Sequence, residues 1–146
     1  MRAVYKWVAT LVTVALVLQV GFAGYGAFYA AHAIDKSKTD PKSIVENQFD
    51  HGFAPHIVNA LVVILSILIL LIVGLVAGAG RWRLGRHGVL ALLLVLQVFL
   101  AGAAFDVPTF GFFHAVNAVL MIAVAGWIAR DGWNASGTSE VPAGPT

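Results

Sequence analysis

The segment LVVILSILILLIVGLVAGAG, residues 61–80, is uncharged and consists mostly of leucine, isoleucine and valine. A helix needs about 20 such residues to cross the hydrocarbon core of a bilayer. The whole chain contains four long runs without Asp, Glu, Lys or Arg, and these are residues 7–34, 51–80, 87–105 and 107–129. In lipid, backbone polar groups are satisfied only in helices or closed barrels, and these runs lack the alternation of barrel strands. The runs therefore predict helices.

The predicted fold is an all-α integral membrane four-helix bundle that crosses the lipid bilayer four times. An apolar content of 60% and a mean hydropathy of +0.87 are too high for a soluble domain of 146 residues. We expect spans at about 7–33, 53–79, 87–105 and 109–129 within a single domain, residues 1–130. Residues 131–146 are rich in Gly, Ser, Thr and Pro, so we expect a flexible polar tail there.

The positive charges predict the orientation, because segments rich in Lys and Arg stay on the cytoplasmic side of a membrane. Six of the nine Lys and Arg flank the span ends that share a side with the two termini, and they are Arg2, Lys6, Arg81, Arg83, Arg86 and Arg130. Both termini are therefore expected in the cytoplasm, with the protein in a bacterial plasma membrane. A signal peptide is the alternative for the first run, but its apolar part is longer than usual.

The sequence indicates no catalytic chemistry. It contains no cysteine, which excludes disulfides and thiolate metal sites. It has no phosphate-binding glycine loop, no His-Glu-x-x-His pattern and no carboxylate within a span, so hydrolysis and proton-coupled transport are not indicated. Its Lys and Arg form no stripe of the kind that binds nucleic acid. We expect a protein without catalytic residues.

Two pairs of similar segments predict an internal repeat. LVLQVGFAG at 16–24 recurs as LVLQVFLAG at 94–102, with seven of nine residues identical, and PHIVNAL at 55–61 recurs as FHAVNAV at 113–119. The order of the two elements is the same in both halves. Because two spans separate the copies, both have the same orientation, which implies two repeated helical hairpins related by an axis along the membrane normal.

The repeat places two histidines at the same depth. His56 and His114 each lie about one turn inside a span, roughly 6–8 Å from its outer boundary. Two neutral imidazoles that face each other across a bundle can ligate haem iron at both axial positions. Each ring then needs an acceptor for its other N–H, from an amide of the same repeat or from a backbone carbonyl. The amides that lie close enough in this pattern are Asn59, Asn117, Gln19 and Gln97, and the phenylalanines expected to wall the site are Phe53, Phe110, Phe112 and Phe113.

A purely structural role for these polar residues is the alternative. A histidine one turn into a span can be neutral and bond to a carbonyl, and Asn and Gln bond across helices at about 0.6–2 kcal/mol each. Small residues follow both glutamines, at Ala23 and Gly26 and at Ala101 and Ala104. Small residues let helices approach or leave a slot for a flat molecule. Haem, a quinone, a lipid or nothing at all could fill that slot.

Three further histidines fall at or beyond the span ends. His32, His51 and His87 are expected to be hydrated surface residues rather than ligands. The Gly74-x-x-x-Gly78 pattern predicts close helix packing.

With these Gln and His elements, the chain resembles small four-span bacterial membrane proteins grouped as a domain of unknown function. More distantly it resembles one four-helix half of haem A synthase, a family in which the second and fourth helices each carry a haem-ligating histidine. The resemblance implies haem b between His56 and His114. That family has Glu three residues before the second-helix histidine and Arg after it, where this chain has Phe53 and Ile57. Its oxygenase activity is therefore not expected here.

Two hypotheses follow from the sequence. The first is a haem b protein for electron transfer or haem handling, in which His56 and His114 are the metal ligands. The second is a haem-free accessory subunit that packs against a larger membrane complex. A homodimer is a further possible partner arrangement, because two copies would rebuild an eight-helix assembly.

Overall fold

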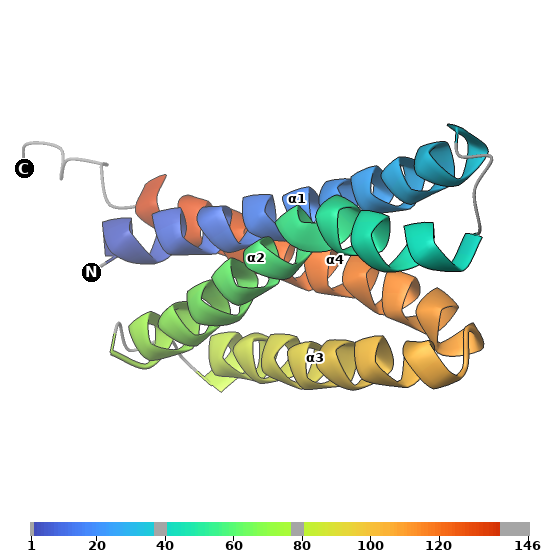
Figure 1. Cartoon of the computed structure of the whole chain (residues 1–146). Helices are drawn as coiled ribbons and strands as arrows, with labels where there is room; N and C mark the ends of the chain where they lie inside the picture. Colours follow the sequence, from blue (N-terminus) through green and yellow to red (C-terminus); the bar gives the residue numbers. More distant parts are fainter. Residues whose placement is uncertain (1, 37–40, 77–80, 138–146) are drawn as a thin grey trace, which may run out of the picture.

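The computed structural model describes residues 2–36, 41–76 and 81–137, and these residues form helices with no strand (Figure 1). The all-α prediction is therefore confirmed for this part of the chain. Side-chain packing is described for residues 3–35, 50–76 and 85–135. The helices are α1 (Arg2–Lys36), α2 (Pro41–Val76), α3 (Arg81–Asp106) and α4 (Thr109–Gly137).

Each helix has a segment long and apolar enough to cross a membrane. These segments are Ala3–Asp35, Asp50–Val76, Gly85–Asp106 and Thr109–Ala135. Most large apolar side chains on them point outward from the bundle, as expected where lipid replaces water as the solvent. The fold is that of a multi-pass membrane protein.

All four helices extend past the predicted spans, furthest at the start of α2 and at the end of α4. α2 begins at Pro41, so the helix includes residues 41–50, which precede the expected second span. α4 continues to Gly137, so the helix includes residues 131–137 of the predicted tail. The extension of α4 is stabilised by packing, because Asp131 pairs with Arg86 and Gly132 lies against the ring of Tyr5. Residues 77–79 of the predicted second span and residues 138–146 of the predicted tail lie outside the described residues.

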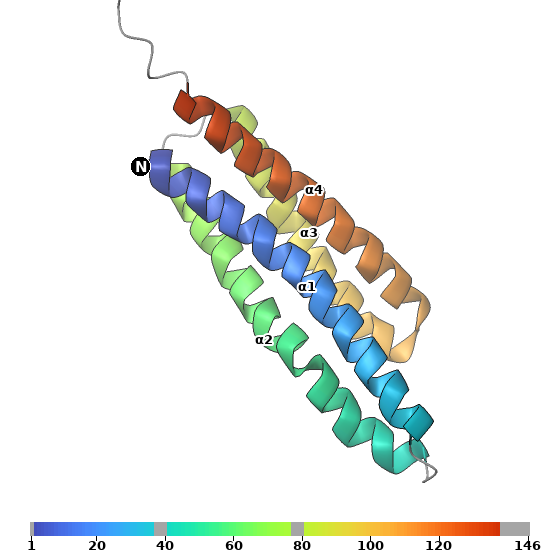
Figure 2. The same cartoon turned by 90° about the horizontal axis from the view of Figure 1, so that it is seen from above.

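The helices run alternately up and down, so that α1 begins and α4 ends at the same end of the bundle (Figure 1). We call this the terminal end and the opposite one the far end. α1 lies between α2 and α4 and packs on both, most extensively on α2 (Figure 2). α3 packs on α4 and makes only a small contact with α2. The α2–α3 interface is therefore the loosest of the four neighbouring pairs.

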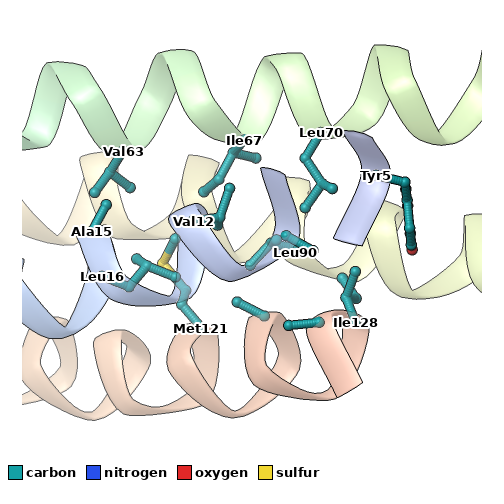
Figure 3. Close-up of a cluster of buried hydrophobic side chains, with 13 residues drawn as sticks. Tyr5, Val12, Ala15, Leu16, Val63, Ile67, Leu70, Leu90, Met121 and Ile128 are labelled. Carbon is teal, nitrogen blue, oxygen red and sulfur yellow. The ribbon is translucent and has the colours of Figure 1, made fainter. Parts of the chain in front are cut away.

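The apolar core lies in the half of the bundle nearer the terminal end, and Figure 3 shows how its side chains meet between the helices. All four helices contribute side chains that are almost completely buried, and the largest are Val12, Ile67, Leu70, Leu90, Met121 and Ile128. Burial of such side chains gives dispersion contacts that lipid tails cannot match at the same density. This core holds the helices together on the terminal-end side of the Gln and His residues that recur in the two similar sequence segments.

Small residues let α1 and α2 approach closely at the far end. A Cβ at Gly26 would lie 2.8 Å from the ring of Phe53, and a Cβ at Gly52 would lie 3.0 Å from the carbonyl oxygen of Gly26. Neither position has room for a larger side chain. The stripe of small residues on α1 is thus filled by α2 itself at this depth.

The terminal end is tied together by aromatic and charged side chains. Trp133 donates its indole N–H to the Thr10 hydroxyl at 3.0 Å and packs edge-on against Trp7. The Lys6 ammonium lies 4.3 Å from the centre of the Trp133 ring. These contacts fasten the last turns of α4 to the first turns of α1, so this end is firmly closed on the α1–α4 side.

Candidate functional site

The first polar cluster joins α1 to α2. The Gln19 side-chain amide donates to His56 Nε2 at 3.2 Å and to the His56 carbonyl oxygen at 2.9 Å. The His56 ring returns a bond from Nδ1 to the backbone carbonyl of Gln19 at 3.1 Å. Asn59, one turn further along α2, donates to Gln19 Oε1 at 2.6 Å and to the Ala15 carbonyl at 2.9 Å. The glutamine thus lies between the histidine and the asparagine.

The second polar cluster joins α3 to α4 through the same kinds of bond. Gln97 donates its amide to His114 Nε2 at 3.1 Å, and His114 Nδ1 bonds the backbone carbonyl of Gln97 at 3.2 Å. Asn117 donates to Gln97 Oε1 at 2.6 Å and to the Leu93 carbonyl at 2.9 Å. Four contacts therefore recur in both clusters, at positions that correspond in the two similar sequence segments.

The backbone carbonyls fix the orientation of these amides and the tautomer of both rings. A carbonyl only accepts, so the Asn59 and Asn117 atoms that face Ala15 and Leu93 must be NH₂ groups. Each of these NH₂ groups also bonds a glutamine oxygen, which leaves the glutamine NH₂ facing the histidine Nε2. Nε2 must therefore accept, and the ring proton lies on Nδ1, bonded to a carbonyl. Both imidazoles have their lone pair on Nε2.

The two imidazoles face each other across the bundle. The centres of the His56 and His114 rings are 6.4 Å apart, and the ring planes are inclined at 58°. Both rings are half-buried. This geometry is consistent with the prediction that His56 and His114 face each other.

Both histidines and both glutamines line one cavity of about 110 Å³. Aliphatic side chains from all four helices make up the rest of its wall, and α2 and α3 supply most of them. None of the four phenylalanines expected at this site belongs to the lining, although Phe53 packs edge-on against His56 at 6.1 Å between ring centres. The lining residues other than histidine and glutamine are Leu16, Ala60, Val63, Ile64, Leu94, Val98, Ala101, Ala118 and Met121.

One buried acceptor in the second cluster has no partner. The side chain of Asn117 is 3% exposed, and its Oδ1 is the one buried side-chain polar atom without a hydrogen bond among the described residues. An unpaired buried acceptor is unfavourable by about 1–3 kcal/mol. Nothing in the two similar sequence segments indicates this difference between Asn117 and Asn59.

The other histidines divide into two kinds. His32 and His51 are exposed, as predicted. His87 is 2% exposed, so the prediction of a hydrated surface residue is wrong for it. His87 is buried because Gly74 has no side chain and so leaves space for the His87 ring: a Cβ at Gly74 would lie 3.0 Å from His87 Nε2. The Tyr5 hydroxyl also contacts this ring, at 3.3 Å from Nε2.

Within the described residues, no group of three or more His, Asp or Glu side chains could hold a metal ion. Any metal at the cavity would therefore depend on two imidazoles. Comparisons of the chain with protein families, with curated proteins and with solved structures find no match.

Proposed function

We propose that this protein binds haem b through His56 and His114 and serves electron transfer or haem handling in a membrane. The observation that supports this most strongly is the pair of facing imidazoles on one cavity, each with its lone pair on Nε2. A neutral imidazole in this tautomer can ligate a metal through Nε2. When bound, haem would supply one-electron redox chemistry within the apolar part of the bundle.

The donor atoms of the site suit this cofactor. Metal–imidazole bonds are about 2 Å long, and two rings with centres 6.4 Å apart leave room for one ion between nitrogens that turn toward each other. Ligating histidines commonly donate their other N–H to a carbonyl, as His56 and His114 do to Gln19 and Gln97. This second bond holds each ring in place.

The volume of the cavity requires a movement. Pockets for drug-sized ligands measure roughly 300–1,000 Å³, so a cavity of about 110 Å³ is smaller than a haem site. The helices that supply most of its wall, α2 and α3, also have the smallest contact in the bundle. Haem binding is therefore expected to separate α2 from α3.

The recurrence of four hydrogen bonds supports a duplicated hairpin as the origin of the site. A pseudo-twofold axis between the hairpins would then place the two histidines level with each other. The resemblance to one half of haem A synthase supports the same assignment of ligands. The concentration of Lys and Arg at the terminal end supports cytoplasmic termini in a bacterial plasma membrane.

Haem titration of protein purified in mild detergent tests the proposal. We expect a Soret band that saturates at one haem per chain, with a spectrum typical of two histidine ligands. His56→Ala and His114→Ala should each abolish that spectrum. His51→Ala is the matched control, because His51 is an exposed histidine on the same helix as His56, and it should change nothing. A wild-type protein that stays colourless would overturn the proposal.

A haem-free accessory subunit is the second candidate. The observation in its favour is that both ring nitrogens of each histidine already have partners on the neighbouring helix. In this role the clusters serve only to join α1 to α2 and α3 to α4. A colourless protein that copurifies in fixed stoichiometry with a larger membrane complex would favour this function.

A further inference from the structure

The lone pairs proposed for iron are occupied by glutamine. Gln19 and Gln97 each place an amide N–H on the Nε2 of the facing histidine, at 3.2 and 3.1 Å. A nitrogen lone pair cannot accept this hydrogen bond and ligate a metal at the same time. Haem binding therefore requires both Nε2 atoms to lose their hydrogen bonds from glutamine.

We propose that Gln19 and Gln97 are switchable caps on the ligating nitrogens, each with a second acceptor already in place. This inference rests on the proposed haem site. Gln19 would keep the His56 carbonyl, and Gln97 would turn its NH₂ to Asn117 Oδ1. The two amides are positioning residues, since they act on the cofactor only through the histidines.

In the first cluster the second acceptor is already in use. The Gln19 amide lies 2.9 Å from the His56 carbonyl, closer than the 3.2 Å to His56 Nε2. Asn59 holds the other end of the same amide at 2.6 Å. If His56 Nε2 turns to a metal, Gln19 still has both partners, so little is lost.

In the second cluster the second acceptor is vacant. Asn117 Oδ1 is buried without a hydrogen bond, while Nδ2 of the same amide already donates to Gln97 Oε1 at 2.6 Å. Rotation of the Gln97 amide toward Oδ1 would close a pair of amides joined by two hydrogen bonds. That pair satisfies the buried acceptor and frees His114 Nε2 together. In this second arrangement Asn117 Oδ1 would gain the hydrogen bond that it lacks in the first.

The proposed switch predicts that two substitutions, Gln97→Leu and Asn117→Leu, have opposite effects on haem affinity. Gln97→Leu removes the cap and should raise the affinity roughly fivefold, the equivalent of one ordinary hydrogen bond. Asn117→Leu removes the acceptor for the displaced amide and should lower the affinity roughly fivefold. In the Gln97→Leu background, Asn117→Leu should have no further effect, because no displaced amide remains. Asn59→Leu is the matched control and should change the affinity less, since Gln19 retains the His56 carbonyl.

A measurement on the haem-free protein tests directly the hydrogen bond from the Gln97 amide to His114 Nε2. The ¹⁵N resonance of His114 Nε2 in histidine-labelled protein should shift toward that of a nitrogen without a hydrogen bond in Gln97→Leu. The His56 resonance should stay unchanged in the same variant. A His114 resonance that is the same in Gln97→Leu and in the wild type would show that Gln97 does not cap His114 Nε2.

The outcomes separate the switch from the haem site. If the wild type binds haem but Gln97→Leu leaves the affinity unchanged, or the effects of the two substitutions simply add, the switch is wrong and the haem site stands. If neither the wild type nor any variant develops a Soret band, the haem site fails and the switch fails with it. Haem binding by Gln97→Leu that exceeds wild-type binding, with the non-additive response of Asn117→Leu, supports both.

Discussion

The two hairpins have the same polar contacts but different packing around them. Gly26 lies seven residues after Gln19, and it accommodates the ring of Phe53, three residues before His56. The corresponding positions of the second hairpin are Ala104 and Gly111, and a Cβ at Gly111 would lie 3.9 Å from the Ala104 methyl. The first hairpin is thus closed by an aromatic ring where the second is closed by a methyl group. The His–Gln–Asn hydrogen bonds do not depend on either arrangement.

The interfaces between the hairpins differ as well. α1 packs closely on α4, and Trp133 fastens the two at the terminal end. The pair at the corresponding positions of the two hairpins, α3 and α2, makes only a small contact. The cavity is lined mostly by this loose pair. A matched set of hydrogen bonds is therefore placed in an asymmetric bundle that is most loosely packed between α2 and α3.

The largest effect is expected where the hairpins meet at the terminal end. His87→Ala would leave a cavity between Gly74 of the first hairpin and α3 and would remove the contact with Tyr5, so unfolding should become easier by about 2–4 kcal/mol. The exposed His51 is the control, and His51→Ala should stay within about 0.5 kcal/mol of wild type. Unfolding free energies in mixed micelles would measure both. Equal effects would show that His87 does not join the hairpins.

The packing difference at the far end predicts opposite signs for two identical substitutions. Gly26→Ala should destabilise the protein by about 1–3 kcal/mol, because its methyl would overlap the Phe53 ring at 2.8 Å. Gly111→Ala meets only ordinary contact at 3.9 Å and should stabilise its helix by about 0.5–1 kcal/mol. The same unfolding assay compares them. Two changes of the same sign would contradict the asymmetry.

The asparagines sharpen the comparison of the polar clusters in the haem-free protein. Asn59→Leu and Asn117→Leu each remove two hydrogen bonds between helices, at about 0.6–1.7 kcal/mol per bond. Asn117→Leu also removes a buried oxygen without a partner, so it should destabilise by about 1 kcal/mol less than Asn59→Leu. The reverse order would mean that Asn117 Oδ1 is satisfied in the membrane.

The smallest effect concerns the contact between α1 and α4. Trp133→Phe keeps an aromatic ring near Trp7 but loses the N–H donated to Thr10, and we expect a loss of about 0.5–1 kcal/mol at this exposed position. Trp127→Phe is the control, since it keeps a ring beneath the Arg86 guanidinium. Melting temperatures in detergent would show a decrease for Trp133→Phe that exceeds the decrease for Trp127→Phe.

The helices themselves were predictable because uncharged runs of this length have no other stable form in lipid. The pairing of His56 with Gln19, and of His114 with Gln97, was partly predictable from the spacing of the polar letters. The sequence identified the residues, but not the direction of their bonds. The carbonyls of Gln19 and Gln97 accept from the rings, and the side-chain amides cap Nε2. These details depend on the rotation of each helix about its axis.

The residues near the ends of the spans were the hardest to predict. His87 has the position of a hydrated residue, yet it is buried because a glycine on another helix makes room for it. The segment after Arg130 has the composition of a tail, yet its first two turns are helical because Asp131 and Trp133 find partners on α3 and α1. These partners, Arg86 and Thr10, lie far from Asp131 and Trp133 in the sequence.

Hydropathy and charge by themselves determined the four membrane-length helices of the described residues, and the recurrence of a few polar letters identified the residues of the two clusters. These properties are local, since each residue's free energy of transfer into lipid depends little on its neighbours. Only the tertiary structure decided that α2 and α3 pack loosely, that the cavity lies against them, and that one asparagine oxygen is left without a partner. Those features depend on how side chains of different size fit together between helices, and that fit is set by all four helices at once.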